Sequence, residues 1–203
     1  YHHQVLPEAA VPGITEVLNT FHDAVFDMQR RVLRIIAVGI GCHETFFEKM
    51  LVDGPTLSRA IHYPPMASAP DAPHVWAGEH GDINLITALP RATAPGLQVK
   101  LKSEGTWIDA VAPEGRAIIN TGLMLETVTN GMIEAGVHRV VAAPGQQGDR
   151  YSVVQFCHPT PWTILSPVVS CTSADRPQRY APISAADALD LVLDEINLIE
   201  DAR

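Results

Sequence analysis

From residue 14 to residue 36, apolar side chains recur every three or four positions. This spacing places them on one face of an α-helix. A Pro-Gly pair precedes the run and two glycines follow it closely. We therefore predict a long amphipathic helix over about 14–38 and a short second helix over 44–51, both packed on a core through their apolar faces.

Between residues 75 and 165, the pattern changes to short apolar-rich runs separated by turns that contain Gly and Pro. Such runs are typical of a β-sandwich or barrel. A helical turn is predicted over 122–130, and a proline-rich loop over 64–73. The chain is therefore expected to be mainly β with flanking helices. The predicted strands are 82–89, 97–102, 106–110, 117–121, 138–141 and 151–158.

Near the end of the chain, Ser184 and Asp187 have the spacing of a capping box. In this motif, the side chains of the first residues satisfy backbone N–H groups at the start of a helix. Apolar residues follow at helical spacing up to about residue 196. We therefore predict a final amphipathic helix that begins at this motif.

Candidate metal ligands lie at His80, Asp82 and His138. Alternate residues of a strand point to the same face, so the first two are expected to project together from the predicted strand. If the strand that holds His138 lies beside it, the three side chains form a 2-His-1-carboxylate site, the arrangement of non-haem Fe(II) oxygenases. The alternative is that these histidines are packed or solvated.

Arg150 and Ser152 are likewise two positions apart in a predicted strand. A guanidinium with a hydroxyl beside it suits the carboxylate of a dicarboxylic co-substrate. Such a charge-assisted contact contributes roughly 1.5–3 kcal/mol. The alternative is that Arg150 is a solvated or ion-paired surface arginine.

Five segments in this order resemble the isopenicillin N synthase-like family of Fe(II)/2-oxoglutarate-dependent dioxygenases. They are 80–89, 96–99, 119–122, 138–140 and 150–152. The resemblance implies that His80, Asp82 and His138 bind iron, and that Arg150 and Ser152 bind 2-oxoglutarate. The segment 59–65 is similar to the family's strand that ends in Tyr-Pro, which implies that Tyr63 lines the co-substrate or substrate pocket.

The same resemblance implies a double-stranded β-helix, a jelly-roll or cupin-like barrel braced by the long N-terminal helix. We expect a single domain over 1–203, with a helical bracing layer over 1–60, the jelly-roll core over 61–168, and a linker and helix over 169–203. Family members usually have a further N-terminal section, and we expect that section to be missing from this chain.

Net charge excludes some partner classes. The 203 residues have a formal net charge of −9 and no basic run, which argues against nucleic acid or an anionic membrane surface as partner. The three cysteines form no spaced cluster, as expected for reduced thiols in a cytoplasmic protein. No apolar run is long enough for a membrane span, and the sequence does not indicate an oligomeric state.

The resemblance implies an enzyme that uses Fe(II), O2 and 2-oxoglutarate to hydroxylate a small molecule, with release of succinate and CO2. Phe156, His158 and His62 are the candidate substrate contacts. Three alternatives remain open. One is an oxidase or cyclase of the isopenicillin N synthase type, which has the Arg-x-Ser pair but does not use 2-oxoglutarate. The others are a desaturase and a non-catalytic ligand-binding barrel.

Overall fold

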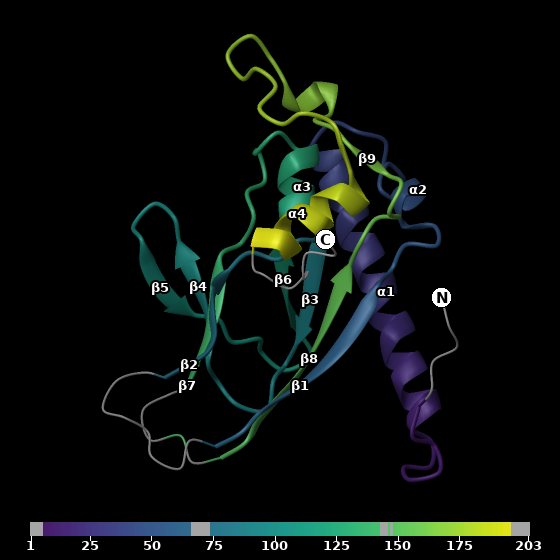
Figure 1. Cartoon of the computed structure of the whole chain (residues 1–203), viewed down its shortest axis with the longest axis vertical. Helices are drawn as coiled ribbons and strands as arrows, with labels where there is room; N and C mark the ends of the chain where they lie inside the picture. Colours follow the sequence, from purple (N-terminus) through teal and green to yellow (C-terminus); the bar gives the residue numbers. More distant parts are fainter. Residues whose placement is uncertain (1–5, 66–73, 143–145, 147, 196–203) are drawn as a thin grey trace, which may run out of the picture.

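The fold is built on two antiparallel sheets of four strands each (Figure 1). The computed structural model describes residues 6–65, 74–142, 146 and 148–195. The first sheet has the order β1 (Leu57–Tyr63), β8 (Arg150–Cys157), β3 (Ile86–Pro90) and β6 (Ala117–Thr121). The second has the order β2 (His74–His80), β7 (His138–Ala142), β4 (Leu97–Leu101) and β5 (Thr106–Asp109). The predicted double-stranded β-helix is thereby confirmed.

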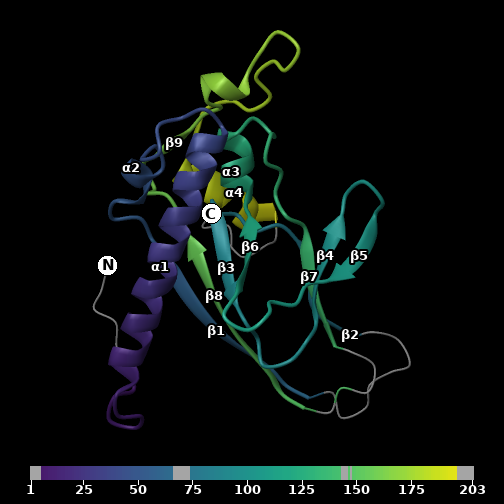
Figure 2. The ribbon, with the colours of Figure 1, turned by 180° about the vertical axis from the view of Figure 1, so that it is seen from behind.

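The long helix α1 (Ile14–Gly39) packs against β8 and β3 of the first sheet (Figures 1 and 2). Its position and length confirm the prediction from hydrophobic periodicity. The remaining elements are α3 (Leu123–Val128), the short strands β9 (Ile164–Leu165) and β10 (Ile183–Ser184), the 3-10 turn η1 (Val169–Cys171) and α4 (Ala185–Glu195).

The second helix was predicted to begin at Glu44, and this is wrong. Helix α2 covers only Glu48–Leu51, because the N–H groups of Phe46 and Glu48 bond to carbonyls three residues earlier, which is turn geometry. The apolar residues of this region still join the core. Phe47 and Leu51 are buried there.

At the start of α4, the hydroxyl half of the predicted capping box is present. The Asp187 backbone N–H donates to the Ser184 hydroxyl oxygen at 3.1 Å, and that hydroxyl donates to the Asp187 carboxylate at 2.6 Å. The predicted proline-rich loop falls largely on residues 66–73, which lie outside the described residues. Among the residues that the structure describes, no helix has the length and apolar character needed to cross a bilayer. The proposed division into three segments stays a prediction.

A buried amide joins α1 to the first sheet. Gln29 is fully buried, and its Nε2 donates to the carbonyl oxygens of Gln155 at 2.8 Å and Ile86 at 3.3 Å. Its neighbours one and two turns later, Leu33 and Ala37, belong to the apolar core. The side chain of Gln29 therefore fixes the height of α1 on β8 and β3, while the apolar residues supply most of the burial.

We expect Gln29→Ala to lower the free energy of unfolding by roughly 2–4 kcal/mol, because it leaves a cavity and removes the side-chain donor from the Gln155 carbonyl. The Ile86 carbonyl keeps its bond from the Asn84 amide. Chemical denaturation monitored by circular dichroism measures this change. Asn19→Ala, at an exposed position of α1, is the matched control and should change stability by less than about 0.5 kcal/mol. Equal effects of the two substitutions would contradict the anchoring role.

Candidate metal and co-substrate site

His80 and His138 lie opposite each other on paired strands. They are partners in the register of β2 and β7, and their ring centroids are 4.3 Å apart. The Nδ1 atom of His80 lies 2.7 Å from the Gly78 carbonyl oxygen, and that of His138 lies 3.0 Å from the Gly136 carbonyl oxygen. A carbonyl only accepts, so each Nδ1 carries the proton and each Nε2 keeps a lone pair for a metal.

Asp82 does not share a strand face with His80, contrary to the prediction. Strand β2 ends at His80 and β3 begins only at Ile86, so Asp82 lies in the connection between them. The two strands belong to different sheets, and the chain has to bend where it crosses. The bend still places a carboxylate oxygen of Asp82 3.9 Å from His138 Nε2.

These three side chains fit a metal ion. One ligand atom from each lies within 4.8 Å of the others; Asp82 and His138 are buried, and His80 is exposed. The buried Oδ2 of Asp82 has no hydrogen-bond partner in the described part of the chain. A buried oxygen of this kind calls for an unseen ion or water, and two imidazoles with one carboxylate suit Fe(II).

Burial lowers the pKa of His138, although the Asp82 carboxylate and the Gly136 carbonyl partly oppose this shift. A lowered pKa keeps the imidazole neutral at lower pH. Because a histidine binds a metal only in its neutral form, the environment of His138 favours the ligand state.

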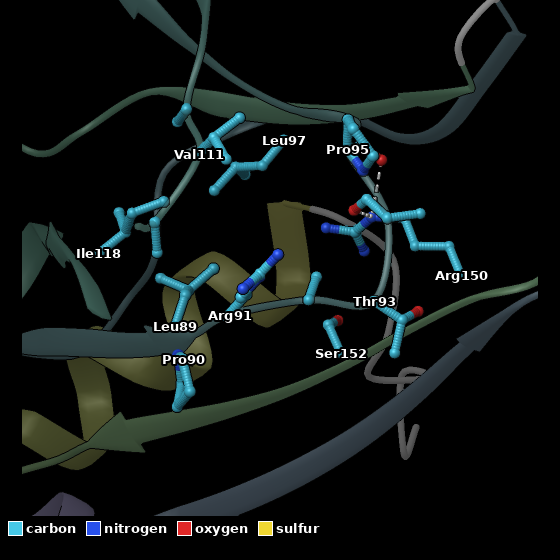
Figure 3. Close-up of a pocket in the computed structure, with 14 residues that line it drawn as sticks. Leu89, Pro90, Arg91, Thr93, Pro95, Leu97, Val111, Ile118, Arg150 and Ser152 are labelled. Atoms are coloured by element: carbon cyan, nitrogen blue, oxygen red, sulfur yellow. Dashed lines mark hydrogen bonds between the residues drawn. The ribbon is translucent and has the colours of Figure 1, made fainter. Parts of the chain in front are cut away.

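Arg150 lies at the start of β8 in the first sheet, where it is paired with Tyr63 in the register of β1 and β8. It is only 4% exposed, and its Nε donates to the carbonyl oxygens of Ala94 and Pro95, each at 3.1 Å (Figure 3). Its guanidinium carbon lies 4.8 Å from the centre of the Tyr63 ring. Burial lowers the pKa of Arg150 and Tyr63 partly offsets this, but an arginine remains charged at neutral pH.

The Nη1 atom of Arg150 is buried and has no hydrogen-bond partner among the described residues. Ser152 lies two positions further along β8, on the same side of the strand, and lines the same cavity. Gly96 fixes the loop that holds Arg150, because its φ is +133° and a Cβ there would lie 2.5 Å from the Val141 carbonyl oxygen. The result is a cation with an open donor beside a hydroxyl.

One cavity of about 370 Å³ joins these two groups. Its wall contains the three candidate metal ligands together with Arg150, Ser152 and Tyr63. These six residues were predicted to form one site, and the structure brings them together in one cavity wall. Their roles as ligands of iron and of 2-oxoglutarate stay predictions.

The candidate substrate contacts are placed differently from one another. Phe156 and His62 line the cavity. His62 is exposed; its Nε2 lies 2.5 Å from a carboxylate oxygen of Asp149, and its ring stacks on Tyr151 at 4.7 Å. His158 is not part of the cavity wall, although it is close enough to Asp82 for that carboxylate to raise its pKa against the larger lowering effect of burial.

Two further lining residues, Trp76 and Arg59, were missed from the sequence. Arg59 could have been predicted from the sequence, because it lies an even number of residues from Tyr63 and therefore shares its strand face. Trp76 could not have been predicted in this way. Register shifts in β2 on both sides of Ala77 break the alternation that would have indicated the face to which the Trp76 side chain points.

A smaller recess of about 140 Å³ adjoins the cavity and shares Arg150 and Ser152 with it (Figure 3). Arg91 also lines this recess. It is exposed and forms no ion pair or side-chain hydrogen bond with the described residues.

Comparison with known proteins gives consistent matches. A family model described as the 2OG-Fe(II) oxygenase superfamily matches residues 55–159. Hyoscyamine 6-dioxygenase from Hyoscyamus niger is 32% identical over 182 residues, which cover 89% of this chain and 51% of the relative. Isopenicillin N synthase from Lysobacter lactamgenus is 30% identical over 183 residues, 86% of this chain and 52% of the relative.

Among solved structures, a full-length Neurospora crassa protein in complex with alpha-KG and thymine superimposes with a TM-score of 0.82 at 31% identity. The match covers 92% of this chain and 58% of the other. The chain thus spans about half the length of the curated relatives that it matches.

Proposed function

Because the chain belongs to the 2OG-Fe(II) oxygenase superfamily, we propose that it is a dioxygenase that uses Fe(II), O2 and 2-oxoglutarate to hydroxylate a small molecule, with release of succinate and CO2. One observation carries the proposal: a single cavity has an unpartnered buried carboxylate oxygen, on Asp82, and an unpartnered buried guanidinium nitrogen, on Arg150, among the described residues. The first suits a metal and the second suits an anion.

The residues divide the task between the two ends of the cavity. His80, Asp82 and His138 hold the metal. The Nδ1 bonds of the two histidines to the Gly78 and Gly136 carbonyls orient both imidazoles, and burial lowers the pKa of His138. Arg150 and Ser152 bind the distal carboxylate of the oxo acid, and Tyr63 supports the guanidinium. When bound, Fe(II) and 2-oxoglutarate supply the activation of O2 that oxidises a C–H bond, and the cavity walls limit the access of water.

A small-molecule substrate is supported by the Neurospora crassa protein, whose structure contains thymine, and by the size of the cavity, which is in the range of small-molecule sites. A second candidate is an Fe(II) oxidase or cyclase that does not use 2-oxoglutarate. The similarity to isopenicillin N synthase is the observation that favours it. The residues of the site do not distinguish a hydroxylase from a desaturase, because that outcome depends on the geometry of the substrate.

The test is to add Fe(II) and then 2-oxoglutarate to the chain without oxygen, and to record the visible absorption spectrum. The expected result is the weak charge-transfer band that arises when the oxo acid chelates Fe(II). Bound iron without this band would overturn the proposal in favour of the 2-oxoglutarate-independent oxidase. Failure to bind iron would contradict both candidates and favour a non-catalytic barrel.

A further inference from the structure

Arg59 lines the cavity. It carries a positive charge that the proposed chemistry does not use. Its neighbour Ser58 bonds to Gln155 and contacts His22 of α1, so the Ser58 side chain faces the helix. Side chains alternate along a strand. Arg59, paired with Val154 on β8, therefore faces the opposite way, and both line the cavity.

The guanidinium of Arg59 is available for a ligand. Arg59 is exposed, and it forms no ion pair or side-chain hydrogen bond within the described part of the chain. Asp82 is the one acidic residue among the described residues that line the cavity. In the proposed function it binds the metal, so it does not pair with Arg59. Arg59 therefore presents an open positive charge in the cavity wall.

The co-substrate does not account for this charge. Arg59 and Tyr63 are four residues apart on β1, which is about 13 Å of strand, and Tyr63 is the residue that pairs with Arg150. The four C–C bonds of 2-oxoglutarate, at about 1.5 Å each, span no more than about 6 Å. Arg150 is held in place by its bonds to Ala94 and Pro95, so a co-substrate bound there does not extend along β1 to Arg59.

Charge balance leads to the same conclusion. The two charges of Fe(II) and the single charge of Arg150 are cancelled by Asp82 and by the doubly negative 2-oxoglutarate. The positive charge of Arg59 then remains without a counterpart in the loaded cavity. Apolar side chains line the same cavity, among them Ile61, Trp76 and Phe156.

We propose that Arg59 is a specificity-determining residue, and that the substrate is a small molecule with one negatively charged group, such as a carboxylate, on an apolar body. Arg59 binds the charged group at the open end of the cavity, and the apolar body lies against Phe156 and Trp76. This inference rests on the proposed function, in which iron and 2-oxoglutarate fill one part of the cavity and the molecule near Arg59 is the substrate.

The test uses two probes that differ only in charge, phenylacetate and phenylacetamide. Each is titrated by calorimetry into the chain loaded with Mn(II), as an oxygen-stable replacement for Fe(II), and with 2-oxoglutarate. The wild-type chain should bind the carboxylate about tenfold or more tightly than the amide, since a hydrogen bond to a charged group is worth at least that factor. Arg59→Gln should abolish the preference, and Arg59→Lys should retain most of it.

Arg91→Gln removes an exposed arginine from the adjoining recess and is the matched control. It should leave the preference for phenylacetate unchanged. Equal binding of the two probes by the wild-type chain, no measurable binding of phenylacetate, or an unchanged preference in Arg59→Gln would each overturn the inference.

The titration with 2-oxoglutarate precedes the probes and reports on the proposed function separately. If the wild-type chain does not bind the oxo acid, the proposed function fails at that step. The preference and its loss in Arg59→Gln are then measured on the metal-loaded chain, where Arg150→Gln shows whether the other arginine has taken the probe.

Discussion

Replacing His138 with alanine should weaken Fe(II) binding by at least about 100-fold and abolish the charge-transfer band with 2-oxoglutarate. Substitutions of residues that merely orient a metal ligand already cost 10–100-fold in affinity, and His138 is itself a candidate ligand. Its Nε2 faces a carboxylate oxygen of Asp82 at 3.9 Å, and its Nδ1 is bonded to the Gly136 carbonyl. The buried Oδ2 of Asp82 has no hydrogen-bond partner among the described residues. Anaerobic titration of Fe(II), followed by equilibrium dialysis, measures the loss.

The matched control for this substitution is His43→Ala. His43 is not among the residues that line the cavity, and its imidazole contacts the Thr45 hydroxyl at 2.9 Å. This variant should bind Fe(II) as the wild-type chain does. Circular dichroism of both variants separates loss of a ligand from loss of the fold. A folded His138→Ala chain that retains stoichiometric iron would refute the assignment of the metal site.

The sequence predicts those parts of this fold that depend on local pattern. The apolar repeat over 14–36 is long enough to define α1 within one residue at its end, and Ser184 with Asp187 defines the start of α4. These features depend on neighbours in the sequence, so no knowledge of the tertiary structure is needed. Turn residues likewise separate the strands β4, β5 and β6 close to their observed bounds.

The features that were not predicted depend on long-range pairing. Asp82 was expected inside a strand, because residues 82–89 have strand-like composition. The crossing between the two sheets takes precedence, since Leu123 and Met124 donate backbone hydrogen bonds to carbonyls of this connection. Pairing between β2 and β7, with its register shifts, likewise decides that Trp76 lines the cavity. Neither the crossing nor the shifts can be read from local periodicity.

The candidate site was predictable for another reason. Its residues were found by chemical type and order, and the resemblance of five segments connected residues far apart in the chain. Arg59 was missed because, within segment 59–65, the resemblance assigns a role only to Tyr63 at the end of the strand. The alternation of β1 would have placed it on the same face. Arg59 is identified instead by its positive charge, which the proposed chemistry leaves without a counterpart.

Replacing Arg150 with alanine should raise the dissociation constant for 2-oxoglutarate by about 10- to 100-fold, while Fe(II) affinity changes little. A hydrogen bond to a charged group contributes roughly 1.5–3 kcal/mol, which corresponds to factors of this size. The dissociation constant of Arg150→Lys should fall between those of the wild-type chain and Arg150→Ala, because lysine keeps a charge but loses the planar fork of donors. Anaerobic titration of the charge-transfer band measures each constant, and Arg91→Gln serves as the control for loss of a nearby exposed arginine.

Arg150 also bonds to the carbonyls of Ala94 and Pro95, so its loss can disturb the loop as well as the anchor. 2-Oxovalerate separates the two effects, because it has the same five-carbon chain without the distal carboxylate. If Arg150 binds that carboxylate, the wild-type chain prefers 2-oxoglutarate, and Arg150→Ala binds the two oxo acids with similar affinity. A general disturbance of the loop would weaken both acids equally and leave the preference in place. That result would assign Arg150 a structural role and leave 2-oxoglutarate without its proposed anchor.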